Sequence, residues 1–270
     1  MKLLNGKDIA DYIKSRQAKQ VRSLKQTYNI TPKLAIIRTN PDPVVDSYMR
    51  LKQNYGKAIG VEVDIYSIDQ AQAIKTIQKL NQDKSVNGII VQIPLPDRSQ
   101  TDEILDSVKP SKDADALGKN AIYDPATPMA INWLLAGYNI ELKSKKIVIV
   151  GKGRLVGNPL AKMWKNSGLN INVVDKSVKD IKQALLDADI IVTATGVPGL
   201  IKKEMIKEGA TIVDAGVATD SNGLVGDVEA SVRELEDIKI TPEKGGVGPL
   251  TVCSLFENVL RSAKEQADKA

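Results

Sequence analysis

Short apolar runs rich in β-branched residues alternate along this chain with longer segments whose apolar residues recur at a helical period. In the first half we predict strands at 34–39, 63–67 and 88–93, and helices near 7–27, 44–59 and 70–82. In the second half we predict strands at 146–150, 171–175, 189–195, 211–216 and 237–241. Such alternation is typical of parallel sheets with helical crossovers, so we predict an α/β fold.

A polar stretch that contains prolines, PSKDADALGKNAIYDPATP, separates the two halves, and the helix-like segment AINWLLAGYNI follows it. We therefore predict two domains, 1–125 and 126–251, of which the second is Rossmann-like. The last segment, 252–270, has a helical apolar period, and we expect it to pack back on the first domain.

Composition excludes several classes of function. The chain has 270 residues, of which 42% are apolar and 26% charged, so a globular protein with sizeable cores is expected. Its net charge of +5 is scattered and only 4% of the residues are aromatic, which argues against nucleic-acid binding. We recognise no signal peptide and no apolar run long enough to span a bilayer. The single cysteine, Cys253, favours a reducing compartment, so we expect a cytoplasmic protein without a membrane partner.

A strand that runs directly into a glycine turn and then a helix, KIVIVGKGRLVGNPLAKMW, indicates a dinucleotide site. Gly151, Gly153 and Gly157 allow close backbone approach to a pyrophosphate, although their spacing departs from the standard fingerprint by one position. Asp175 ends the next strand, where a carboxylate can accept a hydrogen bond from a ribose 2'-hydroxyl. The same turns are also compatible with a doubly wound sheet that binds no nucleotide.

Three basic residues near this turn bear on the choice of cofactor. Lys152, Arg154 and Lys176 would suit the 2'-phosphate of NADP, whereas Asp175 would repel it. We therefore favour NAD, with NADP as the alternative.

Two further strand exits carry short motifs. The segment ATGVPGL, with Thr195 and Gly196, follows a strand at the position where ligands bind in open parallel sheets, although a structural turn explains it about as well. The segment VQIPLP places Gln92 at the end of a buried strand, ahead of two prolines that restrict the backbone.

The chain contains no histidine, so proton transfer near neutral pH must fall to another kind of group. Tyr48 and Lys52 lie four residues apart in SYMRLK and would share one face of a helix. From spacing alone an exposed polar face is the simpler interpretation, and a catalytic lysine is the alternative.

These motifs together resemble one family, the bifunctional methylenetetrahydrofolate dehydrogenase and cyclohydrolase of the FolD type, over nearly the whole chain. The matching segments, in order, are LLNGKDIA at 3–10, SYMRLK at 47–52, NGIIVQIPLP at 87–96, PSKDADA at 110–116, PATP at 125–128, IVIVGKGRLVGNP at 147–159, ADIIVTATGVP at 188–198 and ITPEKGGVGPLT at 240–251. VQIPLP and GGVGPLT are the most specific of them.

The resemblance implies a two-domain homodimer that binds folate in the cleft between its domains. Such an enzyme oxidises 5,10-methylenetetrahydrofolate with NAD or NADP and hydrolyses the methenyl product to 10-formyltetrahydrofolate. By resemblance, Lys52 is the central catalytic group, Gln92 orients Lys52, Tyr48 lies against the folate and Asp115 holds the pterin edge. Gly245, Gly246, Gly248 and Pro249 would line the folate site from the nucleotide side. No metal ligand is assigned.

The chain also departs from the family pattern. Lys152 and Gly153 replace an Arg-Ser pair, Asp175 and Lys176 replace a His-Ser pair, Ala116 replaces a glycine, Ala126 replaces a cysteine, and Glu243 and Lys244 replace a Val-Pro pair. The segment after Asp115 is also shorter than usual. Three alternatives follow: a dehydrogenase without hydrolase activity, a protein that binds folate or nucleotide without turnover, and a two-domain oxidoreductase acting on shikimate or an amino acid.

Overall fold

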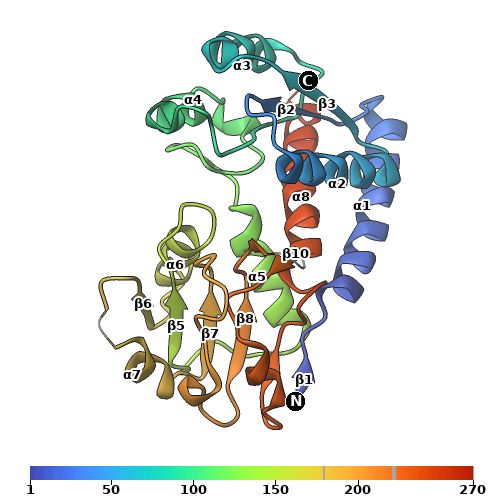
Figure 1. The fold of residues 1–270 in the computed structure, drawn as a ribbon. Coiled ribbons are helices and arrows are strands. Elements are labelled where there is room, and N and C mark those ends of the chain that lie inside the picture. Colours follow the sequence, from blue (N-terminus) through green and yellow to red (C-terminus); the bar gives the residue numbers. More distant parts are fainter. Residues whose placement is uncertain (179, 221–222, 270) are drawn as a thin grey trace. The chain divides into compact units, whose positions relative to one another are not determined.

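The computed structural model describes residues 1–178, 180–220 and 223–269. Contacts within the chain divide it into two compact units (Figure 1). The three-stranded unit comprises Asp11–Ala126 and Val252–Ala270, and the six-stranded unit comprises Met1–Ala10 and Thr127–Thr251.

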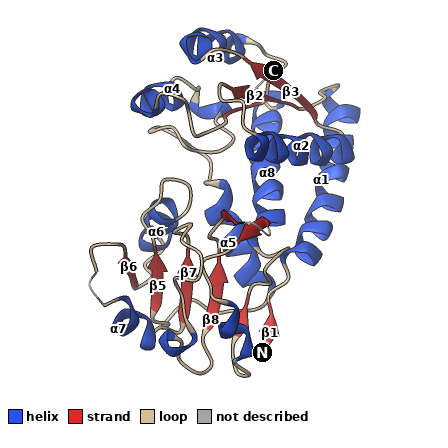
Figure 2. Ribbon diagram, viewed as in Figure 1, coloured by secondary structure: helices blue, strands red, loops and turns tan. Residues whose placement is uncertain are grey.

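The three-stranded unit contains a parallel sheet in the order β3-β2-β4, with β2 at Lys33–Arg38, β3 at Glu62–Ser67 and β4 at Gly88–Val91. Its helices are α1 (Gly6–Tyr28), α2 (Pro43–Ile59), α3 (Ala73–Gln82), α4 (Thr101–Asp106) and α8 (Val247–Ala267), of which α1 and α8 begin in the other unit (Figure 2).

Both faces of this sheet are covered, because successive side chains of a strand point to opposite sides. Leu34 and Ile36 of β2 join the core that α1, α2 and α8 form on one face. Ala35 and Ile37 join the core that α3 and α4 form on the other. The sheet is therefore buried on both sides, as parallel sheets usually are.

Helix α8 closes the first of these cores. Phe256 is fully buried in it. The Nε2 of Gln17 donates to the carbonyl of Cys253 at 2.9 Å, and the Nδ2 of Asn258 donates to the carbonyl of Ala114 at 2.9 Å. The prediction that the last segment packs back on the first domain is confirmed, except for residue 270, which lies outside the described residues.

The six-stranded unit contains a parallel sheet in the order β1-β11-β8-β7-β5-β6. Its strands are β1 (Lys2–Leu3), β5 (Ile147–Val150), β6 (Ile171–Val174), β7 (Ile190–Thr193), β8 (Thr211–Asp214) and β11 (Lys239–Ile240). Helices α5 (Ala126–Gly137), α6 (Gly157–Asn166) and α7 (Ile181–Leu186) and a hairpin of β9 (Ala218–Asp220) and β10 (Gly223–Val225) complete it.

The first residues of the chain extend this sheet. The amide of Lys2 donates to the carbonyl of Ile238 at 2.8 Å, and the amide of Leu4 donates to that of Ile240 at 2.8 Å. Residues Met1–Ala10 consequently belong to the six-stranded unit.

The α/β alternation and the main strands and helices are confirmed by the structure. Strands β4, β7 and β8 end two residues earlier than predicted, at Val91, Thr193 and Asp214. Elements β1, α4, α7 and the hairpin were not predicted from the pattern. Short 3-10 helices lie at Gln70–Gln72, Arg98–Gln100, Pro110–Lys112, Lys203–Met205 and Ala230–Glu234. Within the described residues, no helix combines the length and apolarity needed to cross a membrane.

Candidate active site

Lys52 lies on helix α2 and is brought to the end of strand β4. Its Nζ donates to the Oε1 of Gln92 at 2.9 Å, across 40 positions of the chain. Gln92 is the first residue after β4, and its backbone amide donates to the backbone carbonyl of Ile37 in β2 at 2.9 Å. The backbone of Gln92 is thus held by the sheet while its side chain contacts the amine. Burial lowers the pKa of Lys52, although the nearby Asp115 carboxylate opposes that change.

Asp115 lies in the loop that follows Lys112, close enough to Lys52 for each to shift the other's pKa. Burial raises the pKa of Asp115, and Lys52 acts in the opposite direction. The loop itself is anchored to strand β4, because the amide of Ala114 donates to the carbonyl of Ile89 at 3.2 Å. A lysine, an amide and a carboxylate therefore meet at one site in the three-stranded unit.

Two neighbours complete this region. Tyr48 lies one helical turn before Lys52 on α2; its side chain is half-buried, and burial raises the pKa of its phenol. Asp113, which the sequence interpretation did not assign, is buried and accepts a hydrogen bond from the amide of Gly118 at 2.8 Å. Burial raises the pKa of Asp113 to about 6.

The glycine turn lies between β5 and α6 in the six-stranded unit. Gly151 has a φ of 104°, in the region that favours glycine. A Cβ added at Gly157 would fall 2.0 Å from the carbonyl oxygen of Gly151, so only glycine lets α6 begin this close to the turn. At Gly153 the nearest atom would be the carbonyl oxygen of Ala194 at 3.9 Å, which leaves room beside the backbone.

Asp175 directly follows β6 at the same edge of the sheet as the turn. The hydroxyl and the amide of Ser177 both donate to its carboxylate, and the Nζ of Lys152 lies 3.0 Å from it. These contacts, those of Ser177 first, hold the pKa of Asp175 well below its usual range. Arg154 and Lys176 are exposed.

The segment with Thr195 and Gly196 follows β7 and lies beside the glycine turn. A Cβ added at Gly151 would fall 2.7 Å from the carbonyl oxygen of Ala194, and one added at Gly196 would fall 3.4 Å from that of Val217, after β8. The exits of β5, β7 and β8 are therefore close neighbours. In open parallel sheets this carboxyl edge is where ligands bind.

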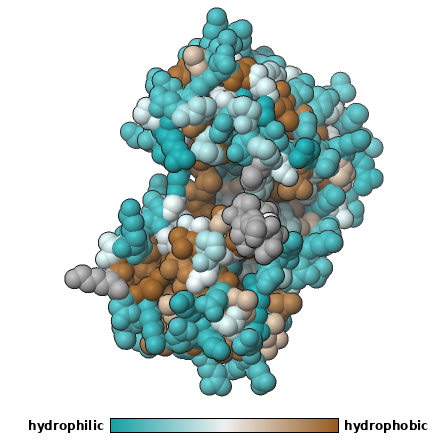
Figure 3. All heavy atoms as spheres, viewed as in Figure 1, coloured by the Kyte–Doolittle hydropathy of each residue, from teal (hydrophilic) through white to brown (hydrophobic). Residues whose placement is uncertain are grey.

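Exposed apolar side chains mark the same edge, and the sequence interpretation missed them. Leu155, Val178, Val197 and Val217 follow β5, β6, β7 and β8 in turn and are between 37% and 57% exposed. Apolar patches are visible among polar side chains on the face of this unit in Figure 3. Apolar residues at an edge that is otherwise polar favour a ligand with a flat apolar part. Only the sheet order brings these residues to one edge.

The GGVG segment follows β11 and anchors the start of α1. The amides of Gly6 and Lys7 donate to the carbonyl of Gly245 at 2.8 and 3.2 Å, and Gly246 is buried against Gly6. Gly248 is exposed, with no atom within 4 Å of an added Cβ, and Pro249 is half-buried. Two of these residues thus support the backbone, whereas Gly248 has open space beside it.

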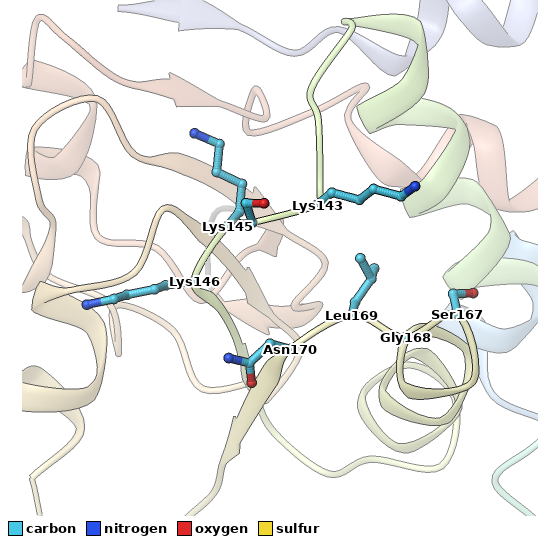
Figure 4. A pocket seen from close by; sticks show the side chains of 8 residues that line it. Lys143, Lys145, Lys146, Ser167, Gly168, Leu169 and Asn170 are labelled. Carbon is cyan, nitrogen blue, oxygen red and sulfur yellow. The ribbon is translucent and has the colours of Figure 1, made fainter.

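A separate pocket of about 390 Å³ lies at the opposite end of the six-stranded sheet (Figure 4). It is lined by Lys143, Ser144, Lys145, Lys146, Ser167, Gly168, Leu169 and Asn170. These residues precede β5 and β6, whereas ligands bind beyond the carboxyl ends of parallel strands. We do not assign the pocket to the active site.

The fold and these two groups of residues define a class: an α/β protein of two units, one with a half-buried lysine site and one with a glycine turn of the dinucleotide-binding type. Two family models match the chain: the catalytic domain of tetrahydrofolate dehydrogenase/cyclohydrolase over residues 4–115, and the NAD(P)-binding domain of the same family over 125–267. The chain belongs to the tetrahydrofolate dehydrogenase/cyclohydrolase family.

Individual relatives match over nearly their full length. The chain is 37% identical to the bifunctional protein FolD of Methanosarcina barkeri, covering 97% of this chain and 96% of the relative. The crystal structure of the FolD methylenetetrahydrofolate dehydrogenase/cyclohydrolase of Campylobacter jejuni is 34% identical with a TM-score of 0.92, covering 98% and 99%. The Trypanosoma brucei enzyme, crystallised with NADP and an inhibitor, is 30% identical with a TM-score of 0.90, covering 97% of each chain.

Proposed function

We propose that this enzyme oxidises 5,10-methylenetetrahydrofolate with a nicotinamide dinucleotide and hydrolyses the methenyl product to 10-formyltetrahydrofolate. The observation that carries the proposal is the hydrogen bond of 2.9 Å from the Nζ of Lys52 to Gln92, with Asp115 nearby, in a chain of this family. A lysine held in this way is suited to proton transfer in a protein that contains no histidine.

The hydrolytic step is the one that requires proton transfer by the protein. Water adds to the methenyl carbon and the five-membered ring opens, and one proton is released for each water consumed. Because burial lowers its pKa, Lys52 is neutral more often than an exposed lysine and can accept that proton. Gln92 accepts a hydrogen bond from the Lys52 amine and so orients it. Asp115 would bind the pterin edge, and the Tyr48 ring would lie against the folate.

The oxidative step needs few groups from the protein, because the dinucleotide supplies the hydride acceptor when bound. The residues at the carboxyl edge of the six-stranded sheet fit such a ligand. Gly151 and Gly157 let the start of α6 pack closely against the glycine turn, and Gly153 leaves open space beside the backbone. The exposed Val197 and Val217 present apolar surface at the same edge. The protein's main contribution to this step is to hold the folate and the dinucleotide close together in the correct orientation. We also propose Gly248 and Pro249 as folate-binding residues, by resemblance to the family.

For the cofactor we propose a preference for NAD over NADP. The carboxylate of Asp175 is ionised at neutral pH, and Ser177 and Lys152 lower its pKa further. A 2'-phosphate would bring further negative charge to the place where a ribose hydroxyl could donate to Asp175. Of the three cations near the turn, Lys152 is already paired with Asp175 at 3.0 Å.

We also propose a homodimer in the cytoplasm, on the basis of family membership and of the single cysteine, respectively.

One set of assays tests the proposed reaction. Purified protein is given methylenetetrahydrofolate with NAD or NADP in turn, and reduced dinucleotide, methenyltetrahydrofolate and formyltetrahydrofolate are followed together. We expect reduced dinucleotide and formyltetrahydrofolate to appear in equal amounts. Accumulation of methenyltetrahydrofolate that hydrolyses no faster than in buffer would show a dehydrogenase alone. Binding of folate without turnover with either dinucleotide would refute the proposed reaction.

A further inference from the structure

One buried carboxyl group, that of Asp227, lies outside the candidate site residues and is hydrogen-bonded to the segment after β7. Asp227 and Thr193 are both fully buried. The Oδ2 of Asp227 accepts hydrogen bonds from the Thr193 hydroxyl at 2.5 Å and the Thr195 amide at 2.6 Å, and its Oδ1 accepts one from the Val197 amide at 3.0 Å. A single side chain therefore satisfies three donors in one short stretch of backbone.

The far end of this stretch is held by the same residue. The amide of Ile201 donates to the backbone carbonyl of Asp227 at 3.0 Å, and the amide of Glu229 donates back to the carbonyl of Ile201 at 2.9 Å. The backbone between these anchors carries Gly196 and Gly199 at φ of 69° and 67°, a conformation that a free loop would readily leave.

A second carboxyl group holds Asp227 in place. The Oδ1 of Asp214, the last residue of β8, accepts from the amides of Asp227 and Gly216 at 3.1 and 3.0 Å. Its Oδ2 accepts from the amide of Val228 at 3.0 Å. The central strand β8 thus supports the segment that presents Asp227, and this segment supports the exit of β7.

Two glycines make room for this arrangement. A Cβ added at Gly216 would fall 2.1 Å from the Oδ1 of Asp227, and one added at Gly226 would fall 2.0 Å from the Oδ2 of Asp214. The two carboxyl groups thus fill the space that side chains at positions 216 and 226 would need.

We infer that Asp227 is a positioning residue for the dinucleotide: it sets the conformation of residues 193–201, and so places Thr195, Gly196 and the exposed Val197 at the ligand-binding edge of the sheet. The inference rests on the proposed function for the identity of the ligand. Asp227 is fully buried and acts through the backbone of this segment.

The test measures dissociation constants of NAD and NADP for the full-length protein by isothermal titration, without folate. In Asp227→Asn an NH₂ group replaces one acceptor oxygen and faces a backbone or hydroxyl donor. We expect the dissociation constant of the preferred dinucleotide to rise at least about tenfold, as expected for the loss of about one strong hydrogen bond. The KM for dinucleotide should rise similarly, while kcat at saturation and hydrolysis of methenyltetrahydrofolate change less than about threefold. Amide exchange at Thr195 and Val197 should become faster.

Two further variants make the test specific. Thr193→Val removes one donor without altering the carboxyl group and should weaken dinucleotide binding in the same direction by a smaller factor. Asp189→Asn is the matched control: Asp189 accepts a hydrogen bond from the Lys146 amide at 2.8 Å just before β7, at the opposite edge of the sheet. The dissociation constant of the dinucleotide for Asp189→Asn should stay within about twofold of that for the wild type.

Several outcomes would overturn the inference. Unchanged dinucleotide affinity in both Asp227→Asn and Thr193→Val would do so, as would an equal loss of affinity in Asp189→Asn. If Asp227→Asn does not fold, Thr193→Val decides, and wild-type affinity in that variant refutes the role. A wild-type protein that binds dinucleotide but does not oxidise methylenetetrahydrofolate would refute the proposed function alone, because the dissociation constants would still test Asp227.

Discussion

Replacing Asp113 by asparagine is expected to stabilise the three-stranded unit near neutral pH and to destabilise it slightly near pH 4, where the loss of hydrogen bonds outweighs the small remaining charge effect. Asp113 is only 5% exposed. Burial raises its pKa from the ordinary 3.8 to about 6; the Asp115 carboxylate adds to the rise, and the Gly118 amide opposes it. Between pH 3.8 and about pH 6 the folded state binds more protons at Asp113 than the unfolded state does. The free energy of unfolding therefore falls as pH rises through this window and stays lower above it.

The size of the effect follows from the same values. A rise of the Asp113 pKa from 3.8 to about 6 on folding lowers the free energy of unfolding by ~3 kcal/mol at pH 7 and above. Asparagine carries no charge, and its carbonyl can still accept from the Gly118 amide. Its NH₂ group cannot accept the hydrogen bonds that the backbone amides of Ala116 and Leu117 donate to the carboxylate. This loss should lower the free energy of unfolding by about 1–2 kcal/mol. The net gain should be about 1–2 kcal/mol, or a few degrees in Tm.

Thermal unfolding at pH 4 and at pH 7.5, followed by circular dichroism, measures this difference. Asp106→Asn is the matched control, because exposed Asp106 accepts from the Lys119 amide at 2.7 Å in the same region. The control should change Tm by only a small amount, because Asp106 is exposed. A Tm of Asp113→Asn that is lower than that of the wild type by equal amounts at both pH values would refute the assignment of a raised pKa to Asp113.

Three further predictions concern the two sites. Lys52→Met should lower the rate of methenyltetrahydrofolate hydrolysis roughly 100- to 10,000-fold, since it removes the proton acceptor; wild-type turnover would contradict the role of Lys52. Asp175→Ser should raise kcat/KM with NADP relative to NAD by about tenfold, and a wild type that already prefers NADP would contradict the proposed preference. Gly157→Ala should cost about 1–3 kcal/mol in urea unfolding, because the new Cβ would fall 2.0 Å from the Gly151 carbonyl oxygen. Gly153→Ala, where the nearest atom would be 3.9 Å away, should cost less than 1 kcal/mol, and equal losses would refute the steric argument.

The fold class was predictable because strands buried on both faces leave a direct trace in the chain. Strands β5 and β7 are buried along their whole length and appear as unbroken β-branched runs. The ends of strands were less predictable. Strand β4 stops at Val91, although Ile93 is also apolar, since the register with β2 ends at the pair of Ile37 and Val91 and the backbone amide of Gln92 makes one further hydrogen bond to Ile37.

The candidate sites were predictable to different degrees. The glycine turn and Asp175 lie within one strand-helix-strand unit, so their spacing along the chain indicates a shared edge. Spacing alone made Lys52 an exposed helix position, and only the resemblance to the family indicated a partner for it. The structure supplies that partner, Gln92, from a different strand.

By itself the sequence determined what depends on neighbouring residues: the alternation of strands and helices, the glycine turn, and the order of motifs that marks the family. The tertiary structure alone decided which distant segments meet. It pairs β1 with β11 and so assigns the first ten residues to the six-stranded unit, and it places Asp227 beside Thr195 across 32 positions. Such contacts depend on strand order and on the closure of long loops, which local apolar periodicity does not encode.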